Sequence, residues 1–332
     1  MSEGTDGKPK VFITRRIPVP VIERVAAECD VDFFDSDDVI PRDELLSRVA
    51  GVDGVITLLT EKVDAEFLEA AGPQLKIVAN YAVGYDNIDV AACTDKGVPA
   101  SNTPDVLTET TADIAWALMM ATARRVAEGD RFLRSETPWI WGPLMMLGMD
   151  VYGKTLGVVG FGRIGQAVAR RAMGFGMKIV YWSRSHAPSE VEEELGAEYR
   201  EFHDLLAESD FISINCALTP ETRHLFGADQ FKAMKETAIV VNTARGPVVD
   251  EAALAAALHG GDIRGAGIDV FEKEPEVHPD LLKCENAVII PHLGSATVET
   301  RIAMGMKAAD NLLAALKGDT PPTLINPQVW HP

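Results

Sequence analysis

The sequence has few cysteines, no long apolar run and a shortage of cations. Its four cysteines, Cys29, Cys93, Cys216 and Cys284, lie far apart without a CxxC pair, which argues against a zinc site and a disulfide framework. Only 31 Lys and Arg face 50 Asp and Glu, and the resulting charge of -19 repels nucleic acid and anionic membranes. The most apolar stretch, residues 114–123, is too short to span a bilayer, and no signal peptide pattern precedes it. We therefore expect a cytoplasmic protein without a metal, nucleic-acid partner or membrane partner.

Short runs rich in Val and Ile alternate along the chain with amphipathic stretches of helical period. This alternation predicts βαβ units, and 332 residues are enough for two domains. The strand candidates of the first part are 11–14, 31–34, 54–57 and 76–80. Those of the second part are 155–159, 178–182, 211–215, 238–242, 265–269 and 287–290. We expect an α/β fold of two doubly wound parallel sheets.

A long helical pattern at 110–128 separates the two sets of strands and suits a domain connection. A final helix, 298–316, follows the last strand and is expected to return to the first domain. The chain would then cross twice between the domains, forming a hinge over a cleft. The expected division is residues 1–104 plus 295–332 for one domain and 105–294 for the other.

A glycine-rich turn follows the strand at 155–159. Its glycines, Gly160, Gly162 and Gly165, form GxGxxG between an apolar strand and a helix beginning near Gln166. In this context the first glycine permits the tight turn, the second lets a pyrophosphate approach the backbone, and the third lets helix and strand pack closely. The alternative is a turn without a ligand, but the strand before and the helix after it favour a dinucleotide site.

The end of the next strand indicates which dinucleotide is bound. An NAD site usually has an acid there to bind the ribose 2'-hydroxyl. This chain instead has Ser183, Arg184 and Ser185, and its first acid is Glu190. Because a guanidinium binds phosphate oxygens bidentately, NADP(H) is favoured, while NAD(H) remains possible and Arg184 could be a solvated loop charge.

Three polar residues follow the carboxyl ends of strands in the second part, where ligands bind in open α/β sheets. Arg245 could hold a carboxylate and polarise a ketone. His292 could donate a proton to the developing alkoxide, and Glu274 could orient the imidazole and favour its protonated form. Each has a structural alternative as an ion-pair partner, a surface acid or a loop histidine. Together, beside a nicotinamide, they predict reduction of a 2-oxo acid.

Long motifs in family order cover nearly the whole chain: NYAVGYDNIDV, NTPDVLTETTADIAWALMMATARR, LGVVGFGRIGQAVARR, LTPETRHLFG, VVNTARGPVVDE, GAGIDVFEKEP and PHLGSATVETR. With them the chain resembles the D-isomer-specific 2-hydroxyacid dehydrogenases, most closely their glyoxylate/hydroxypyruvate reductase branch. The resemblance implies a flavodoxin-like substrate domain and a Rossmann cofactor domain. It also implies Arg245 at the substrate carboxylate and carbonyl, Glu274 as partner of the histidine, and His292 as proton donor.

The resemblance implies further positions that spacing does not show. The backbone amides of Val83 and Gly84 are expected to receive the substrate carboxylate, so that the cleft closes for turnover. The remaining positions implied for the cofactor are Thr108, Phe161, Arg163, Ile164, Cys216, Pro220, Thr243, Ala244 and Asp269. Arg245 and His292 would also border it, and Cys216 and Pro220 have the alternative of ordinary loop packing.

Related enzymes are typically homodimers, and the apolar segment PWIWGPLMMLGM at 138–149 fits an interface, or else a loop packed on its own core. The alternative activity is that of phosphoglycerate dehydrogenase, although its substrate would need additional cations. Formate dehydrogenase is disfavoured because, in that relative, the position of Glu274 is a glutamine. A dinucleotide-sensing corepressor that binds peptides is the alternative outside the enzymes.

Overall fold

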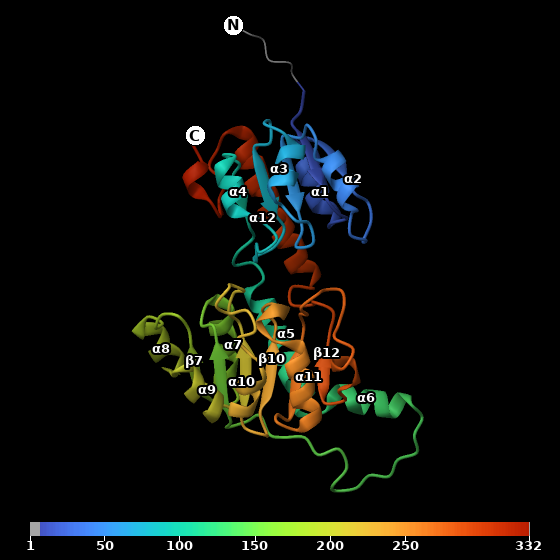
Figure 1. Ribbon diagram of the computed structural model, residues 1–332, viewed down its shortest axis with the longest axis vertical. Coiled ribbons are helices and arrows are strands. Elements are labelled where there is room, and N and C mark those ends of the chain that lie inside the picture. The colour runs from blue at the N-terminus through green and yellow to red at the C-terminus, as the bar shows by residue number, and fades with distance from the viewer. Residues whose placement is uncertain (1–6, 332) are drawn as a thin grey trace. The chain divides into compact units, whose positions relative to one another are not determined.

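The structure of the protein, a computed structural model, describes residues 7–331 (Figure 1). It divides into two compact units. One ends at Leu107 and resumes at Ala296, and the other is Thr108–Ser295. The first is coloured blue to cyan with a red C-terminal segment, and the second green to orange (Figure 1). These boundaries lie close to those expected from the sequence.

The first unit is built on a parallel sheet with the strand order β2-β1-β3-β4-β5. This is the doubly wound order of flavodoxin-like folds. Its strands are β1 (Lys10–Ile13), β2 (Asp30–Phe33), β3 (Gly54–Thr57), β4 (Ile77–Asn80) and β5 (Ala100–Ser101). β3 and β4 are buried along their whole length, which explains why they are apolar throughout rather than alternating.

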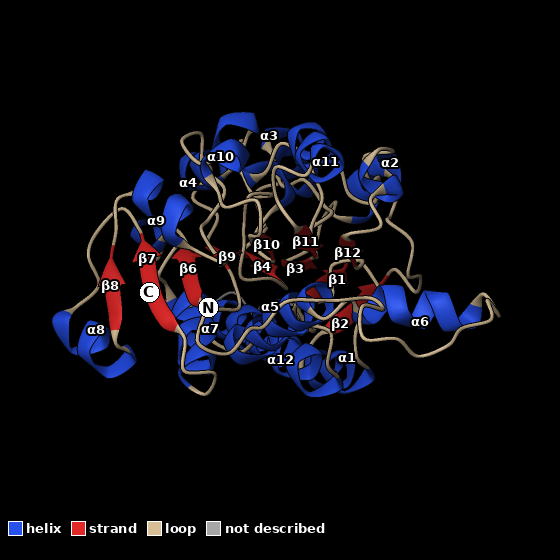
Figure 2. Ribbon diagram, turned by 90° about the horizontal axis from the view of Figure 1, so that it is seen from below, coloured by secondary structure: helices blue, strands red, loops and turns tan. Residues whose placement is uncertain are grey.

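Helices cover both faces of this sheet (Figure 2). They are α1 (Val19–Ala26), α2 (Arg42–Arg48), α3 (Ala65–Ala71), α4 (Val90–Asp95) and α12 (Val298–Lys317). On one face Val21 of α1 and Leu312 of α12 share an apolar core, and on the other Leu45 and Phe67 do so. The expected return of the last helix to the first domain is confirmed.

The second unit contains a parallel sheet of seven strands in the order β12-β11-β10-β9-β6-β7-β8. The chain starts at the centre and winds outward on both sides, which is the Rossmann arrangement with one further strand. The strands are β6 (Thr155–Val159), β7 (Lys178–Trp182), β8 (Ala197–Tyr199), β9 (Phe211–Ile214), β10 (Ile239–Asn242), β11 (Gly265–Ile268) and β12 (Ala287–Ile289). The predicted fold class is confirmed.

In this unit α5, α7 and α8 pack on one face of the sheet and α9, α10 and α11 on the other (Figure 2). The helices are α5 (Thr108–Ala123), α6 (Val126–Arg134), α7 (Arg163–Met173), α8 (Ser189–Leu195), α9 (Phe202–Glu208), α10 (Ala228–Ala233) and α11 (Glu251–Gly260). Short 3-10 helices lie at Gly246–Val248 and Leu281–Lys283, and Pro327–Val329 forms another in the first unit.

Three local predictions were wrong or incomplete. The helix expected at 110–128 is two helices, because Arg125 takes a left-handed conformation (φ 54°) between α5 and α6 and pairs with Glu128. β5 and β8 were not predicted, since two or three residues are too few to show a period.

Within residues 7–331, no helix is sufficiently long and apolar to cross a membrane.

Candidate active site

The candidate residues of the second unit follow the carboxyl ends of its strands. Gly160 follows β6, Ser183 follows β7, Thr243 follows β10 and Asp269 follows β11. Because neighbouring parallel strands end at the same edge of a sheet, these segments form one rim, the usual place for ligands in this fold.

The glycine turn between β6 and α7 has the geometry that its spacing predicts. Gly160 has φ 92°, and a Cβ atom there would come within 2.5 Å of the backbone nitrogen of Cys216. At Gly165 a Cβ would lie 2.2 Å from the carbonyl oxygen of Gly160. At Gly162, by contrast, a Cβ would meet no protein atom within 4 Å. The first and third glycines thus serve the fold, and the second keeps space open at the rim.

Gly162 is the N-cap of α7, whose first residues are Arg163, Ile164 and Gly165. The first amides of a helix have no partner within the helix, and together with the helix dipole they favour a phosphate. No acidic residue stands in this first turn. Phe161 stacks on Tyr181 with ring centroids 4.1 Å apart and is 6% exposed, so only its backbone faces the turn. This geometry fits a pyrophosphate.

The rim segment after β7 has the polar residues that we associated with NADP. The Ser183 hydroxyl donates a hydrogen bond of 2.5 Å to the carbonyl of Ser185, which closes the turn. The Arg184 side chain is exposed and contributes, after a hydrogen bond from Thr219, to lowering the pKa of Glu221. Arg184 lies on the rim because it follows the end of β7 by two residues.

Two further rim positions fit a bound nicotinamide dinucleotide. The Thr243 hydroxyl is buried and has no hydrogen-bond partner among residues 7–331, as expected of a group whose partner is a ligand. Cys216 follows β9 and is half-buried, and desolvation raises the pKa of its thiol to about 11, so it is a thiol at neutral pH. Pro220 is exposed in the following loop, and Thr108 is the first residue of α5.

The structure brings His292 and Glu274 together, as predicted. Nδ1 of His292 lies 2.8 Å from Oε2 of Glu274, and the other oxygen of this carboxylate accepts a hydrogen bond of 3.0 Å from the amide of Phe271. Burial acts to raise the pKa of Glu274, but its contact with His292, the Phe271 amide and the charge of Arg245 lower it. The carboxylate is thus ionised, and Nε2 of His292 is the ring nitrogen left for a substrate.

Asp269 fixes the loop that carries His292. Its carboxylate is buried and accepts hydrogen bonds from the amides of Leu293 (2.5 Å) and Gly294 (2.8 Å), while its carbonyl accepts one from the amide of His292 (2.9 Å). His292 itself has φ 51°, a conformation that a non-glycine residue keeps only when its surroundings impose it. Burial raises the pKa of Asp269 despite these hydrogen bonds.

Arg245 is held by a residue that sequence reasoning missed. The side chain of Asn242 donates to the carbonyl of Arg245 (3.0 Å) and accepts from the amide of Ala244 (3.0 Å). Nη1 of Arg245 donates to the carbonyl of Ala244. A polar residue at the end of an otherwise apolar strand, three residues before the arginine, was the available signal.

In the first unit, Val83 and Gly84 lie in the loop after β4. Their carbonyls accept hydrogen bonds from the side chains of Asn102 (2.8 Å) and Asn80 (2.9 Å). Among residues 7–331, no backbone hydrogen bond uses the amide of Val83 or Gly84 as donor. Amides without a backbone partner of this kind are able to receive an anion.

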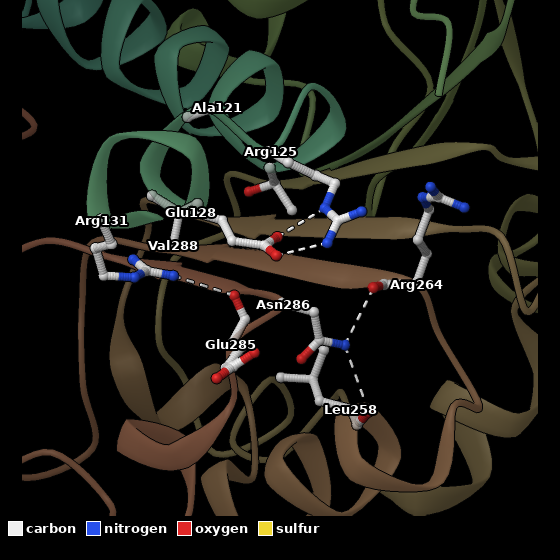
Figure 3. A pocket seen from close by; sticks show the side chains of 10 residues that line it. Ala121, Arg125, Glu128, Arg131, Leu258, Arg264, Glu285, Asn286 and Val288 are labelled. Carbon is white, nitrogen blue, oxygen red and sulfur yellow. Dashed lines mark hydrogen bonds and ion pairs between the residues drawn. The ribbon is translucent and has the colours of Figure 1, made fainter. Parts of the chain in front are cut away.

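A pocket of about 340 Å³ lies elsewhere in the second unit (Figure 3). It is formed before β11 and β12, at the amino ends of these strands, by Arg264, Asn286 and residues of α5 and α6. Two of its charges compensate one another, since Arg125 pairs with Glu128 (Figure 3). No candidate site residue lines this pocket.

A sequence model of the family described as D-isomer specific 2-hydroxyacid dehydrogenase, NAD binding domain, matches residues 116–294. The glyoxylate reductase of Thermococcus onnurineus is 53% identical over 329 residues, which are 98% of each chain. That of Thermococcus kodakarensis is also 53% identical, over 97% of each chain.

Solved structures show the same relationship. A glyoxylate reductase from Paecilomyes thermophila has a TM-score of 0.87 at 34% identity, over 98% of this chain and 100% of that one. An NADPH-dependent glyoxylate/hydroxypyruvate reductase from Sinorhizobium meliloti, in complex with NADP and malonate, has a TM-score of 0.84 at 33% identity. The match covers 98% of this chain and 99% of that one. The chain therefore belongs to the D-isomer specific 2-hydroxyacid dehydrogenase family and is a nicotinamide-dependent oxidoreductase.

Proposed function

We propose that this enzyme reduces a small 2-oxo acid, glyoxylate or hydroxypyruvate, to the D-2-hydroxy acid. The observation that carries the proposal is the pair of His292 and Glu274 at 2.8 Å, with Arg245 near enough to lower the pKa of the same carboxylate. The names of the similar proteins support these substrates. They do not favour the alternative of phosphoglycerate oxidation.

Substrate binding and proton transfer are assigned to different residues of the chain. The guanidinium of Arg245 binds the carboxylate and polarises the ketone, and the amides of Val83 and Gly84 also receive the carboxylate. The protonated imidazole of His292 gives its Nε2 proton to the alkoxide oxygen, while Glu274 keeps Nδ1 as the bonded nitrogen and stabilises the cation. Bound reduced nicotinamide supplies the hydride.

NADP(H) is the preferred cofactor in this proposal, and NAD(H) is a poorer one. Support comes from Arg184 on the rim, from the lack of an acid at residues 183–189, and from the NADP bound by the Sinorhizobium meliloti relative. The pyrophosphate would lie against Gly162 and the first turn of α7. Thr243, Ala244, Asp269 and Thr108 would surround the nicotinamide, and Cys216 and Pro220 the adenine.

The test is the initial rate of glyoxylate reduction by the wild type and by His292→Ala, with NADPH and NADH in parallel. We expect a rate that His292→Ala lowers by about 10²- to 10⁴-fold, the usual contribution of a general acid. Arg184→Ala should raise KM for NADPH and leave that for NADH unchanged. Arg134→Ala, at an exposed arginine of α6, is the matched control. An undiminished rate in His292→Ala would refute the mechanism.

We also propose that two copies of the chain associate through residues 138–149. This segment has no helix or strand, and its Ile140, Trp141 and Leu144 are 91%, 76% and 81% exposed. Clustered exposed aromatic and aliphatic residues are typical of an interface. Sedimentation should give twice the chain mass for the wild type and for the control Val39→Ser, and the single mass for Trp141→Ser. A single mass for the wild type would refute it.

We place the enzyme in the cytoplasm. All four cysteines are free thiols, and Cys29, Cys93 and Cys284 are buried. Unpaired cysteines suit a reducing compartment, where disulfides are rare. Localisation of the tagged chain by cell fractionation tests this placement.

A further inference from the structure

In the loop after β4, two backbone carbonyls accept hydrogen bonds that fix the orientation of their peptides and so of the amides that follow. Thr103, just after β5, donates its amide to the carbonyl of Ala82 (2.8 Å), and the side chain of Asn102 donates to the carbonyl of Val83 (2.8 Å). Two neighbouring residues of the chain thus hold two successive carbonyls of the loop.

The direction of the amides follows from the planarity of the peptide. In a trans peptide the C=O of one residue and the N–H of the next point to opposite sides. The cis bond that the structure contains is Glu274–Pro275, so both loop peptides are trans. Thr103 therefore turns the amide of Val83 away from β5, and Asn102 does the same to the amide of Gly84.

Asn102 is itself fixed to the C-terminal part of the chain through its backbone. Its amide donates to the carbonyl of Thr323 (3.3 Å), and the hydroxyl of Thr323 donates to its carbonyl (2.6 Å). Thr323 is in turn held by Asn311 of α12, which donates to its hydroxyl (2.8 Å) and accepts from its amide (2.9 Å). Asn311 is fully buried. The side chain of Asn102 thus extends from a rigid support.

We infer that Asn102 is a positioning residue for the substrate carboxylate. By fixing the peptide between Val83 and Gly84, its side chain keeps the amide of Gly84 oriented toward the anion. Without this side chain the peptide can rotate, and the amide of Gly84 is then oriented toward the carboxylate for only part of the time. This inference rests on the proposed function, in which the two amides bind the carboxylate.

The experiment replaces only the side chain, because the contacts with Thr323 use the backbone of Asn102. Asn102→Ala should raise KM for glyoxylate and the inhibition constant of oxamate, a carboxylate analogue of 2-oxo acids, by about tenfold each, the loss of roughly one hydrogen bond. Asn102→Asp, of equal size but without a donor and with a negative charge, should raise both further. We expect kcat and the affinity for NADPH to stay within about twofold, since no reacting group changes.

The control is Asn326→Ala. Asn326 is buried in the first unit and, like Asn102, donates to a carbonyl, that of Val98 (3.0 Å), but outside this loop. This variant should lower Tm and leave KM unchanged, which separates positioning from loss of stability.

Two results would overturn the inference: unchanged oxamate affinity in both Asn102 variants, or a fall in kcat with KM unaltered. Oxamate affinity is measured by quenching of bound NADPH fluorescence and needs no turnover. A wild type that does not reduce glyoxylate but binds oxamate through Asn102 would therefore refute the proposed substrate and leave the inference standing.

Discussion

The pair of Glu274 and His292 gives the sharpest prediction. In Glu274→Gln the carboxylate becomes a neutral amide of the same size, so the geometry of the loop is largely kept while the charge is lost. The ring of His292 then loses the charge-assisted contact at Nδ1 that keeps Nε2 as the donor. Since reduction needs a proton from this ring, the rate of reduction should fall.

The size of the fall in rate follows from the contact. A charge-assisted hydrogen bond contributes about 1.5–3 kcal/mol in protein interiors. The side chains of His292 and Glu274 are 32% and 37% exposed, so solvent screens the pair. We therefore take the lower end, about 1.5 kcal/mol. At about 1.4 kcal/mol per factor of ten, kcat/KM for glyoxylate should fall by roughly tenfold.

The assay is kcat/KM for glyoxylate at neutral pH, for the wild type and two variants. The matched control is Glu272→Gln, since Glu272 pairs with another histidine of the same unit, His224, also at 2.8 Å. We expect the control to keep the wild-type kcat/KM. An undiminished kcat/KM in Glu274→Gln, or an equal loss in Glu272→Gln, would refute the role of the carboxylate.

Three further predictions follow from single contacts. Gly162→Ala should keep the wild-type Tm, because its Cβ meets no protein atom, yet raise KM for NADPH by about tenfold or more by blocking the pyrophosphate, whereas Gly165→Ala should lose stability; equal Tm losses in both would contradict this. Arg245→Lys should lower kcat/KM for glyoxylate by about 10²-fold through loss of the bidentate fork, and an unchanged value would exclude Arg245 from the carboxylate site. Burial acts to raise the pKa of Asp210, but hydrogen bonds from Lys235 (2.8 Å) and from the amide of Thr155 (2.9 Å) lower it. The stabilisation from these contacts is present above the unfolded pKa and is lost as pH falls through the folded one. Asp210→Asn should therefore cost about 1–2 kcal/mol in denaturant unfolding near pH 7, and progressively less as the pH falls below about 4, near the pKa of a free aspartate. A pH-independent difference would contradict that reasoning.

Much of the fold could be predicted because buried strands appear in the sequence as apolar runs. β6 and β7 were predicted with their observed bounds, since they are apolar runs between turns. The break at Arg125 was not, because Arg125 itself is compatible with a helix and its left-handed conformation is decided by the packing of α5 and α6. The short strands β5 and β8 exist only because a neighbouring strand pairs with them.

The same distinction applies to the site. The sequence by itself determined the glycine turn, the lack of an acid after β7 and the three catalytic candidates, because these depend on residue type at fixed spacing along the chain. Only the tertiary structure decided that Asp269 holds the loop of His292 and that Asn102 holds Val83. Asn102 and Val83 are 19 residues apart. Such hydrogen bonds depend on which segments the sheets bring side by side, and the spacing of residues along the chain does not indicate this.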